Sequence, residues 1–342
     1  MFIFATLQRP TRILVIRFSS IGDIVLTTPV FRYLQEQLEG EIEIHFVTKK
    51  KFAGVLSANP RIKKIHTIEK TVQEVMPELK SLDFDYVIDL HRNARSYFVK
   101  KGLKKLSFSV KKHNTAKWLL VRFGINIMPP NHVVDRYLAC LKAFSVQDDG
   151  KGLEYYLPQN TEFDRTLLTE SFKEGHIAWV IGGAHAGKKL LPENVVGVIS
   201  KIKHPIVLIG GSEDSEAAQK ILEAGNSHVI DLTGKLSIHE SADCIRQSAL
   251  VVSGDTGMMH IASAFGKKIV SIWGCTVPEF GMYPYRPHPL STIVQPWHLK
   301  KRPCSKLGNR CNYGPPGSCI QQIDSDHLVE TINRLFTSEK EP

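Results

Sequence analysis

The sequence predicts an α/β protein with two similar βαβ assemblies in tandem, each built on a parallel sheet. Short runs of β-branched residues alternate with helical stretches, which is the pattern of parallel α/β layers. This rhythm stops once, at about residues 147–172, where QDDGKG and PQNTEFDR are polar, and then restarts. A length of 342 residues suits two domains. We therefore expect one domain over 1–155, a second over 172–323, and a C-terminal helix and tail over 324–342.

The first half of the chain contains five strand-like segments, beginning with the apolar run RILVIRF. The expected strands are 12–18, 41–47, 64–68, 86–90 and 106–110. The expected helices are 23–38, a segment after HRNARS, and stretches near 114–122 and 132–144.

The second half repeats the alternation, beginning with the strand-like HIAWVI. The expected strands are 176–181, 206–209, 229–232, 250–253 and 268–273. The expected helices are one starting near 192, then 213–224, 237–248, 257–265 and 324–337. Because ligands of such sheets bind at the carboxyl ends of the strands, the loops that follow the strands are the first candidates for a site.

The net charge of +10 falls entirely within residues 1–150, and the rest of the chain is balanced. This asymmetry favours a polyanionic partner for the first half, such as nucleic acid, a phosphorylated glycolipid or an anionic membrane surface. No basic motif interleaved with aromatic residues and no zinc-finger spacing selects nucleic acid, so we expect none. We find no signal peptide and no apolar run long enough to span a membrane, and expect a cytoplasmic protein.

Three of the six cysteines, Cys304, Cys311 and Cys319, lie in the Gly- and Pro-containing stretch PCSKLGNRCNYGPPGSCI. Their spacing matches none of the common zinc patterns, and a metal would need His298 or another group as a further ligand. A redox pair is a second alternative, although disulfides are rare in the cytoplasm. We favour free thiols in a surface loop and expect no bound metal.

Asp23 follows the first strand in the turn Ser19-Ser20-Ile21-Gly22-Asp23. At the start of a helix its carboxylate stays ionised and could accept a proton from a substrate. The alternative is that Asp23 only caps the helix. The turn contains no G-x-G-x-x-G, which argues against a dinucleotide-dependent dehydrogenase.

Two further loops follow strands of the second half. The first, GGAHAGKK, ends in Lys188 and Lys189; it has a lysine where a P-loop needs Ser or Thr, so a nucleoside triphosphatase is disfavoured. Its backbone N–H groups and lysines could still hold a diphosphate, unless it is simply a flexible basic loop. In the second, GGSED, Glu213 or Asp214 could bind ribose hydroxyls, or could act with Ser212 as a helix cap.

The segment SGDTGMMH is the most specific motif of the chain. Thr256 and Gly257 open a helix whose free N–H groups can bind phosphates. His260 lies about one turn further on and is either a buried structural hydrogen-bonding group or a functional one.

In this order the segments resemble the ADP-heptose:lipopolysaccharide heptosyltransferases of glycosyltransferase family 9. The resemblance covers about residues 12–335 and rests on RILVIRFSSIGDIVLTTP, YVIDLHRNARS, the GG…GKKLLPE loop, GGSED and VVSGDTGMMHIASAFGKKIVSIWGCTVPE. It implies a GT-B architecture of two facing Rossmann-like domains, with acceptor bound mainly by the first and donor by the second. It also implies transfer with inversion, without a metal or another cofactor.

The resemblance assigns roles to individual residues. It implies that Asp23 is the general base and that Lys189 contacts the donor phosphates. The implied donor-site residues are Lys188, Lys189, Gly211, Glu213, Asp214, Asp255, Thr256, Gly257 and His260. The implied acceptor-site residues are Ser20, Gly22, Arg92 and Arg95. Leu191 departs from the family, which has Trp at this position, and leaves the identity of the donor sugar open.

The expected function is transfer of a heptose or related sugar from an ADP-sugar to the inner core of lipopolysaccharide. The expected partners are a nucleotide-sugar donor, an anionic glycolipid acceptor and the inner membrane as a peripheral contact. The alternatives are a transferase that uses a UDP- or GDP-sugar and a non-catalytic nucleotide-binding relative.

Overall fold

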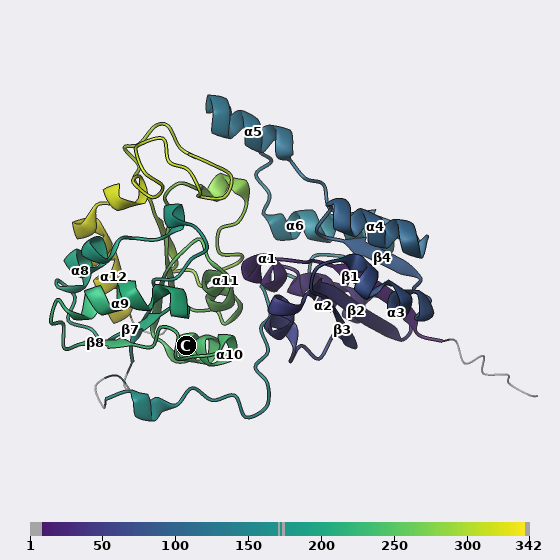
Figure 1. The fold of residues 1–342 in the computed structure, drawn as a ribbon, viewed down its shortest axis with the longest axis horizontal. Helices are drawn as coiled ribbons and strands as arrows, with labels where there is room; N and C mark the ends of the chain where they lie inside the picture. Colours follow the sequence, from purple (N-terminus) through teal and green to yellow (C-terminus); the bar gives the residue numbers. More distant parts are fainter. Residues whose placement is uncertain (1–8, 170–171, 173–174, 339–342) are drawn as a thin grey trace, which may run out of the picture. The chain divides into compact units, whose positions relative to one another are not determined.

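The computed structural model describes residues 9–169, 172 and 175–338. The contacts divide the chain into two compact units (Figure 1). Unit 1 contains the residues up to Lys112 together with Val134–Lys151, and unit 2 contains His113–Val133 and the residues from Gly152 onward.

Unit 1 is built on a five-stranded parallel sheet with the order β3-β2-β1-β4-β5. The central strand β1 is buried from Ile13 to Ile16, as its unbroken apolar run predicts. All five expected strands are confirmed. They are β1 (Thr11–Ile16), β2 (Ile42–Lys49), β3 (Lys64–Ile68), β4 (Tyr86–Asp89) and β5 (Leu106–Ser109).

The helices of unit 1 are short, and one prediction about them is wrong. The single helix expected over 23–38 is two helices, α1 (Ile21–Val25) and α2 (Thr28–Gln37). Pro29 lies in the first turn of α2, where its missing N–H group is tolerated, whereas inside a continuous helix it would remove a hydrogen bond. The other helices are α3 (Met76–Ser81), α4 (Ala94–Leu103), α6 (Val133–Leu138) and the 3₁₀ segments η1 (Lys50–Leu56), η2 (Val72–Glu74) and η3 (Ala139–Phe144).

Unit 2 contains a six-stranded parallel sheet with the order β11-β10-β9-β6-β7-β8. Five of these strands are predicted by the sequence, and β11 is not, because it is only three residues long and lacks a clear pattern. The strands are β6 (Ile177–Val180), β7 (Ile206–Ile209), β8 (Val229–Asp231), β9 (Leu250–Gly254), β10 (Ile269–Ile272) and β11 (Thr292–Val294).

Helices cover both faces of this sheet, and each face has its own apolar core. The C-terminal helix α12 packs against α8, and its Leu328 and Ile332 are fully buried. The helices are α5 (Asn114–Phe123), α8 (Pro192–Ile199), α9 (Ser215–Leu222), α10 (Ile238–Gln247), α11 (Gly257–Ala264) and α12 (Ser325–Thr337). The 3₁₀ segments are η4 (Arg165–Leu167), η5 (Ala186–Lys188), η6 (Ser212–Asp214), η7 (Pro278–Phe280) and η8 (Ile320–Gln322).

Among the described residues, no helix combines the length and the apolar character that a membrane crossing requires.

Candidate functional site

Asp23 lies in the first turn of α1, directly after β1, and its carboxylate has partners on both oxygens. Asp23 Oδ2 accepts hydrogen bonds from the backbone N–H (3.1 Å) and the hydroxyl (2.8 Å) of Ser20, and the first of these bonds belongs to a capping box at the start of α1. Asp23 Oδ1 forms an ion pair of 2.6 Å with Arg17. The cap that the sequence offered as an alternative is therefore present, and the side chain still keeps 21% of its surface exposed.

Arg17 is the main determinant of the Asp23 electrostatics, and the sequence analysis missed it. Burial alone would raise the pKa of Asp23, but the Arg17 charge and the Ser20 hydrogen bonds outweigh burial and lower this pKa to about 2. Arg17 is itself held by the carbonyls of Ser19 (2.8 Å) and Leu90 (2.7 Å). Asp23 is thus an ionised carboxylate at neutral pH, fixed in orientation by a second charged side chain.

The expected acceptor residues Arg92 and Arg95 lie on the loop after β4 and at the start of α4, and both are exposed. The Arg92 backbone N–H donates to the buried Asp89 carboxylate (2.7 Å), and its guanidinium donates to the Val110 carbonyl (3.2 Å). Asp89 also pairs with Lys100 at 3.0 Å. The buried Asp89 carboxylate thus binds the loop backbone and the Lys100 ammonium of α4, while Arg95 is exposed at the start of that helix.

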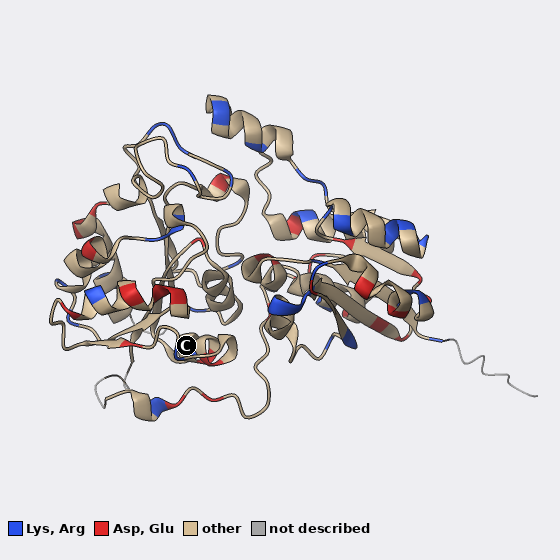
Figure 2. Cartoon of the chain, viewed as in Figure 1, with Lys and Arg blue, Asp and Glu red and all other residues tan. Residues whose placement is uncertain are grey.

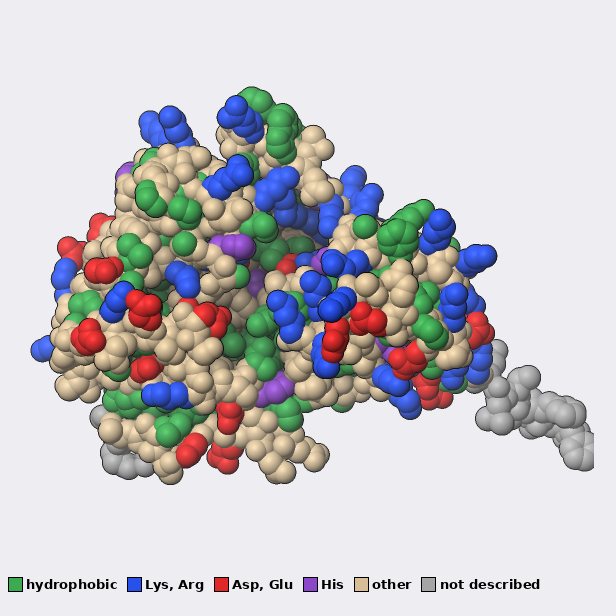
Figure 3. Space-filling model, in the orientation of Figure 1, with side chains coloured by type: hydrophobic (Ala, Val, Ile, Leu, Met, Phe, Trp, Pro, Cys, Tyr) green, Lys and Arg blue, Asp and Glu red, His purple; other side chains and the backbone are tan. Residues whose placement is uncertain are grey.

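Lys and Arg side chains are concentrated along α4 in the charge-coloured views (Figures 2 and 3). The same helix exposes two large apolar side chains, Tyr97 and Phe98, which are 55% and 53% exposed. This surface of unit 1 is therefore both basic and partly apolar.

In unit 2, each of the two predicted lysines forms an ion pair with a carboxylate from another loop. Lys188 Nζ lies 2.7 Å from Asp255 Oδ2, and Lys189 Nζ lies 2.9 Å from Asp214 Oδ1. Both carboxylates are almost fully buried, whereas Lys188 and Lys189 keep 19% and 30% of their side-chain surface. The loops after β6, β7 and β9 therefore converge at the carboxyl end of the sheet, as the parallel topology predicts.

Glu213 and Asp214 have different environments, which separates the two candidates for a ribose contact. Asp214 is buried and also accepts a hydrogen bond of 3.0 Å from the backbone N–H of Gly211. Glu213 is exposed at the start of the same 3₁₀ turn. Asp214 thus organises the loop, and Glu213 is the carboxylate open to a ligand.

Helix α11 begins at Gly257, immediately after the N-cap residue Thr256. The Thr256 hydroxyl lies 3.0 Å from that of Ser253, so the first-turn N–H groups of the helix are not capped by it. A Cβ atom at Gly183 would lie 3.1 Å from Lys189 Cγ and 3.6 Å from Thr256 Cγ2, which shows that the lysine loop and the start of α11 are adjacent. His260 is buried in α11.

Asp255 connects this site to the segment after β10, because its Oδ2 also accepts a hydrogen bond of 3.1 Å from the Thr276 hydroxyl. Thr276 follows Cys275, whose role the sequence did not suggest. The expectation of thiols in a surface loop is wrong for Cys304 and Cys319, which are 5% and 0% exposed.

A separate cavity of unit 2 contains none of the expected site residues. It is lined by Asn126, Met128, Pro129, Pro130, Asn131, Pro278, Glu279, Gly281 and Tyr283.

Comparison with known protein families gives a match to glycosyltransferase family 9 (heptosyltransferase) over residues 72–312. Among curated relatives, the lipopolysaccharide heptosyltransferase 1 of Campylobacter coli is 23% identical, and the match covers 96% of this chain and all of the relative.

Solved structures agree with the family match. A glycosyltransferase family 9 protein from Veillonella parvula superposes with a TM-score of 0.74 and 22% identity, covering 96% of this chain and 98% of that one. The ADP-heptose LPS heptosyltransferase II of E. coli gives a TM-score of 0.74 and 17% identity, covering 95% and 98% of the two chains. The shared fold confirms the predicted GT-B architecture with two Rossmann-like domains.

Proposed function

This chain belongs to glycosyltransferase family 9, and from that premise we propose that it transfers a heptose from ADP-heptose to the inner core of lipopolysaccharide, with inversion at the anomeric carbon. The names of its relatives in Campylobacter and E. coli support the substrate classes. The proposal rests mainly on the pair of lysines beside the start of α11. Lysine ammonium groups and the free N–H groups of a helix start together can bind a nucleotide diphosphate.

In the proposed reaction, an acceptor hydroxyl oxygen forms a bond to the anomeric carbon of the donor. The bond between that carbon and the diphosphate oxygen breaks, and ADP leaves. Asp23 accepts the proton that the hydroxyl loses. A carboxylate with a pKa of about 2 is a weak base toward a resting alcohol, so proton transfer accompanies bond formation, when the hydroxyl becomes strongly acidic.

The charge that develops on the leaving diphosphate is stabilised by Lys188, Lys189 and the N–H groups at the start of α11. A fixed donor aimed at developing charge contributes roughly 2.7–4 kcal/mol in comparable sites. These groups take the role that a divalent cation has in many other transferases, so the proposed transfer step needs no metal. Glu213 is the proposed ribose contact, because Asp214 is already occupied by Lys189.

Thermal shift measurements with ADP, UDP and GDP test the proposed donor. ADP should stabilise the protein most, because binding of a ligand to the folded state raises the melting temperature. Protection by UDP or GDP alone would contradict the ADP-heptose proposal. Leu191 is 52% exposed next to the lysine loop, at a position where the family has Trp. Because of this difference, a donor that carries a different sugar stays the alternative.

An activity assay with ADP-heptose and a heptose-free core acceptor separates the enzyme from a non-catalytic relative. The proposed enzyme releases ADP only when both substrates are present, and a nucleotide-binding protein without turnover releases none.

The proposed acceptor is an anionic glycolipid, and contact with the membrane surface is part of the proposal. Besides α4, the segment around α5 supports it, with Trp118, Phe123 and Ile127 each at least half exposed and with Lys117 and Arg122 in the same helix. Basic groups attract anionic lipids, and exposed aromatic rings insert at the headgroup level.

Flotation with liposomes tests this contact. Binding should require anionic lipid and weaken when Trp118 and Phe123 are both replaced by Ala. Equal binding of the double variant, or binding to neutral liposomes alone, would contradict the membrane proposal.

A further inference from the structure

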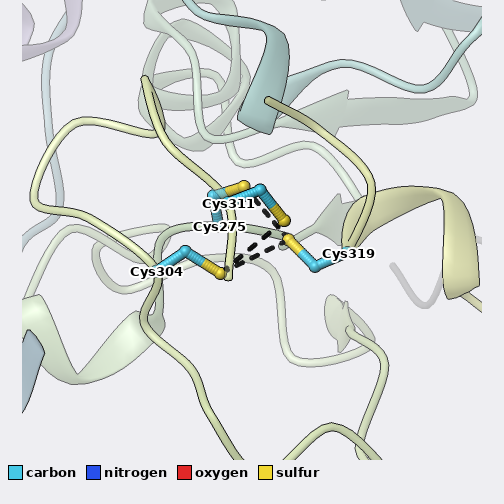
Figure 4. A group of neighbouring side chains, drawn as sticks. All are labelled: Cys275, Cys304, Cys311 and Cys319. Carbon is cyan, nitrogen blue, oxygen red and sulfur yellow. Dashed lines mark hydrogen bonds between the residues drawn. The ribbon is translucent and has the colours of Figure 1, made fainter. Parts of the chain in front are cut away.

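We infer that unit 2 contains a structural metal site in which Cys275, Cys304, Cys311 and Cys319 bind one thiophilic ion, Zn²⁺ or iron. The four side chains point toward one another from two separate parts of the chain, the segment after β10 and the loop between β11 and η8 (Figure 4). Cys275 follows β10, Cys304 and Cys311 belong to the loop after β11, and Cys319 precedes η8. The fourth member of the group is therefore Cys275 and not His298.

The distances between the sulfur atoms fit a tetrahedral site. A tetrahedral ion with metal–sulfur bonds of about 2.3 Å places its four ligands about 3.8 Å apart. Cys304 Sγ lies 3.9 Å from both Cys311 Sγ and Cys319 Sγ, and all four sulfur atoms lie within 4.8 Å of one another. Cys275 Sγ and Cys319 Sγ, at 3.1 Å, need to separate by less than 1 Å to reach the same spacing.

The burial of the group favours a metal over four unrelated thiols. Cys275 and Cys319 are completely buried, Cys304 nearly so, and only Cys311 is partly open to solvent.

A partly buried cation, Arg302, lies beside the group and would offset part of its negative charge. Four thiolates around a divalent ion carry two net negative charges. Arg302 donates hydrogen bonds to the carbonyls of Gly274 (2.6 Å) and Thr276 (3.2 Å), on either side of Cys275. It therefore fixes the backbone of this ligand and supplies a positive charge close to the sulfur atoms.

The site has a consequence for the lysine loop, which rests on the proposed function. The backbone N–H of Cys275 donates to the Gly187 carbonyl (3.1 Å), and the Gly187 N–H donates to the Gly308 carbonyl (3.0 Å). Gly308 lies between Cys304 and Cys311. A metal that joins these cysteines would therefore hold Lys188 and Lys189 in position for the donor phosphates, without contacting the substrate.

The test is metal analysis of the full-length protein, purified without a polyhistidine tag and without chelators from medium supplied with zinc and iron. We expect about one metal ion per chain. Iron would give visible absorption and zinc would not, so the spectrum and mass spectrometry of the metal identify the ion. X-ray absorption at the metal edge should show four sulfur ligands at about 2.3 Å.

Variants connect the ion to these cysteines. Cys304→Ser and Cys311→Ser should lose most of the metal, whereas Cys244→Ala should keep it, because Cys244 is a buried thiol of the same unit outside the group. Loss of the metal should also weaken ADP binding.

Metal-free wild-type protein, metal retained in both serine variants, or a disulfide among these cysteines in protein purified under reducing conditions would each overturn the inference. If the serine variants do not fold, X-ray absorption of the wild-type protein decides, because ligands other than sulfur also overturn it. None of these measurements needs a donor or acceptor, so the metal site and the proposed transfer can fail independently.

Discussion

The two candidate sites differ in the way that their charged groups are held. In unit 1, the partners of Asp23 come from the same strand–helix turn, namely Arg17 and Ser20. In unit 2, Lys188 and Lys189 pair with carboxylates from two other strand ends. The first site is formed by local backbone geometry, and the second exists only when the sheet has assembled.

This difference also bears on substrate binding. The Asp23 carboxylate is already ionised and oriented, so in the proposed reaction the acceptor needs only to approach it. The lysines of unit 2 are neutralised by Asp214 and Asp255, so a diphosphate must share or replace these carboxylates. We therefore expect substitutions in unit 1 to change turnover and substitutions in unit 2 to change donor affinity as well.

The largest expected effect comes from Asp23→Asn. Removal of the proposed base should lower kcat about 10²–10⁴-fold, with little change in ADP affinity, as measured by an ADP-release assay and calorimetry. Glu74→Gln is the matched control, because Glu74 also forms a capping box in unit 1 and its pKa is also lowered to about 2. If Asp23→Asn retains full turnover, Asp23 is only a cap.

Lys189→Met should have the next largest effect, because it removes a proposed phosphate contact and leaves Asp214 buried without its ion pair. We expect kcat/KM to fall about 10²-fold or more, together with weaker ADP binding. The additional change Asp214→Asn should restore stability but not activity. Lys201→Met removes an exposed ion pair of the same unit and should be neutral; an equal loss in this variant would contradict a specific role for Lys189.

Gly187→Ala tests whether the site of unit 2 depends on distant contacts. A Cβ atom there would lie 2.4 Å from the Gly308 carbonyl and 2.6 Å from the Cys275 side chain, so the loops must move apart. We expect destabilisation of about 1–3 kcal/mol in thermal unfolding and weaker ADP binding. Gly197→Ala, in α8 with open space around it, should be neutral or slightly stabilising. Equal stability of the two variants would show that the contacts of Gly187 with Gly308 and Cys275 are not tightly packed.

The smallest expected effect is the pH dependence of the stability that the Asp23 carboxylate contributes to unit 1. The pKa of Asp23 is lowered from 3.8 to about 2, so its ionised form stabilises the folded state above pH 3.8, and this stabilisation is lost as the pH falls through about 2. The stability difference between wild type and Asp23→Asn, measured by denaturant unfolding, should be about 2 kcal/mol at pH 7 and should shrink below about pH 4. A difference that changes instead between pH 5 and 7 would assign the titration to another group.

The alternation of strands and helices was sufficient to predict ten of the strands, because each is a short apolar run beside a turn. The break between α1 and α2 could have been predicted from Pro29, whereas β11 could not, since Thr292–Val294 is shorter than any reliable pattern.

The candidate site residues also divide into those that local sequence predicts and those that it does not. The contact between Asp23 and Ser20 could be predicted because the two residues are only three positions apart at a helix start. The Lys188–Asp255 pair and the approach of Cys275 to the other cysteines depend on which strands are neighbours, and a single sequence does not contain that information. Arg17 was missed because it ends an apolar strand and looks like an ordinary charge at a strand boundary.

The pairing of Lys188 and Lys189 with buried carboxylates has a consequence for ionic strength. Screening by salt acts strongly on exposed charges and weakly on charges enclosed by protein. The exposed cations along α4 should therefore lose their attraction for an anionic surface as salt rises, while the enclosed pairs of unit 2 change little. Rising salt should therefore weaken binding of the proposed glycolipid acceptor more than binding of the proposed nucleotide donor.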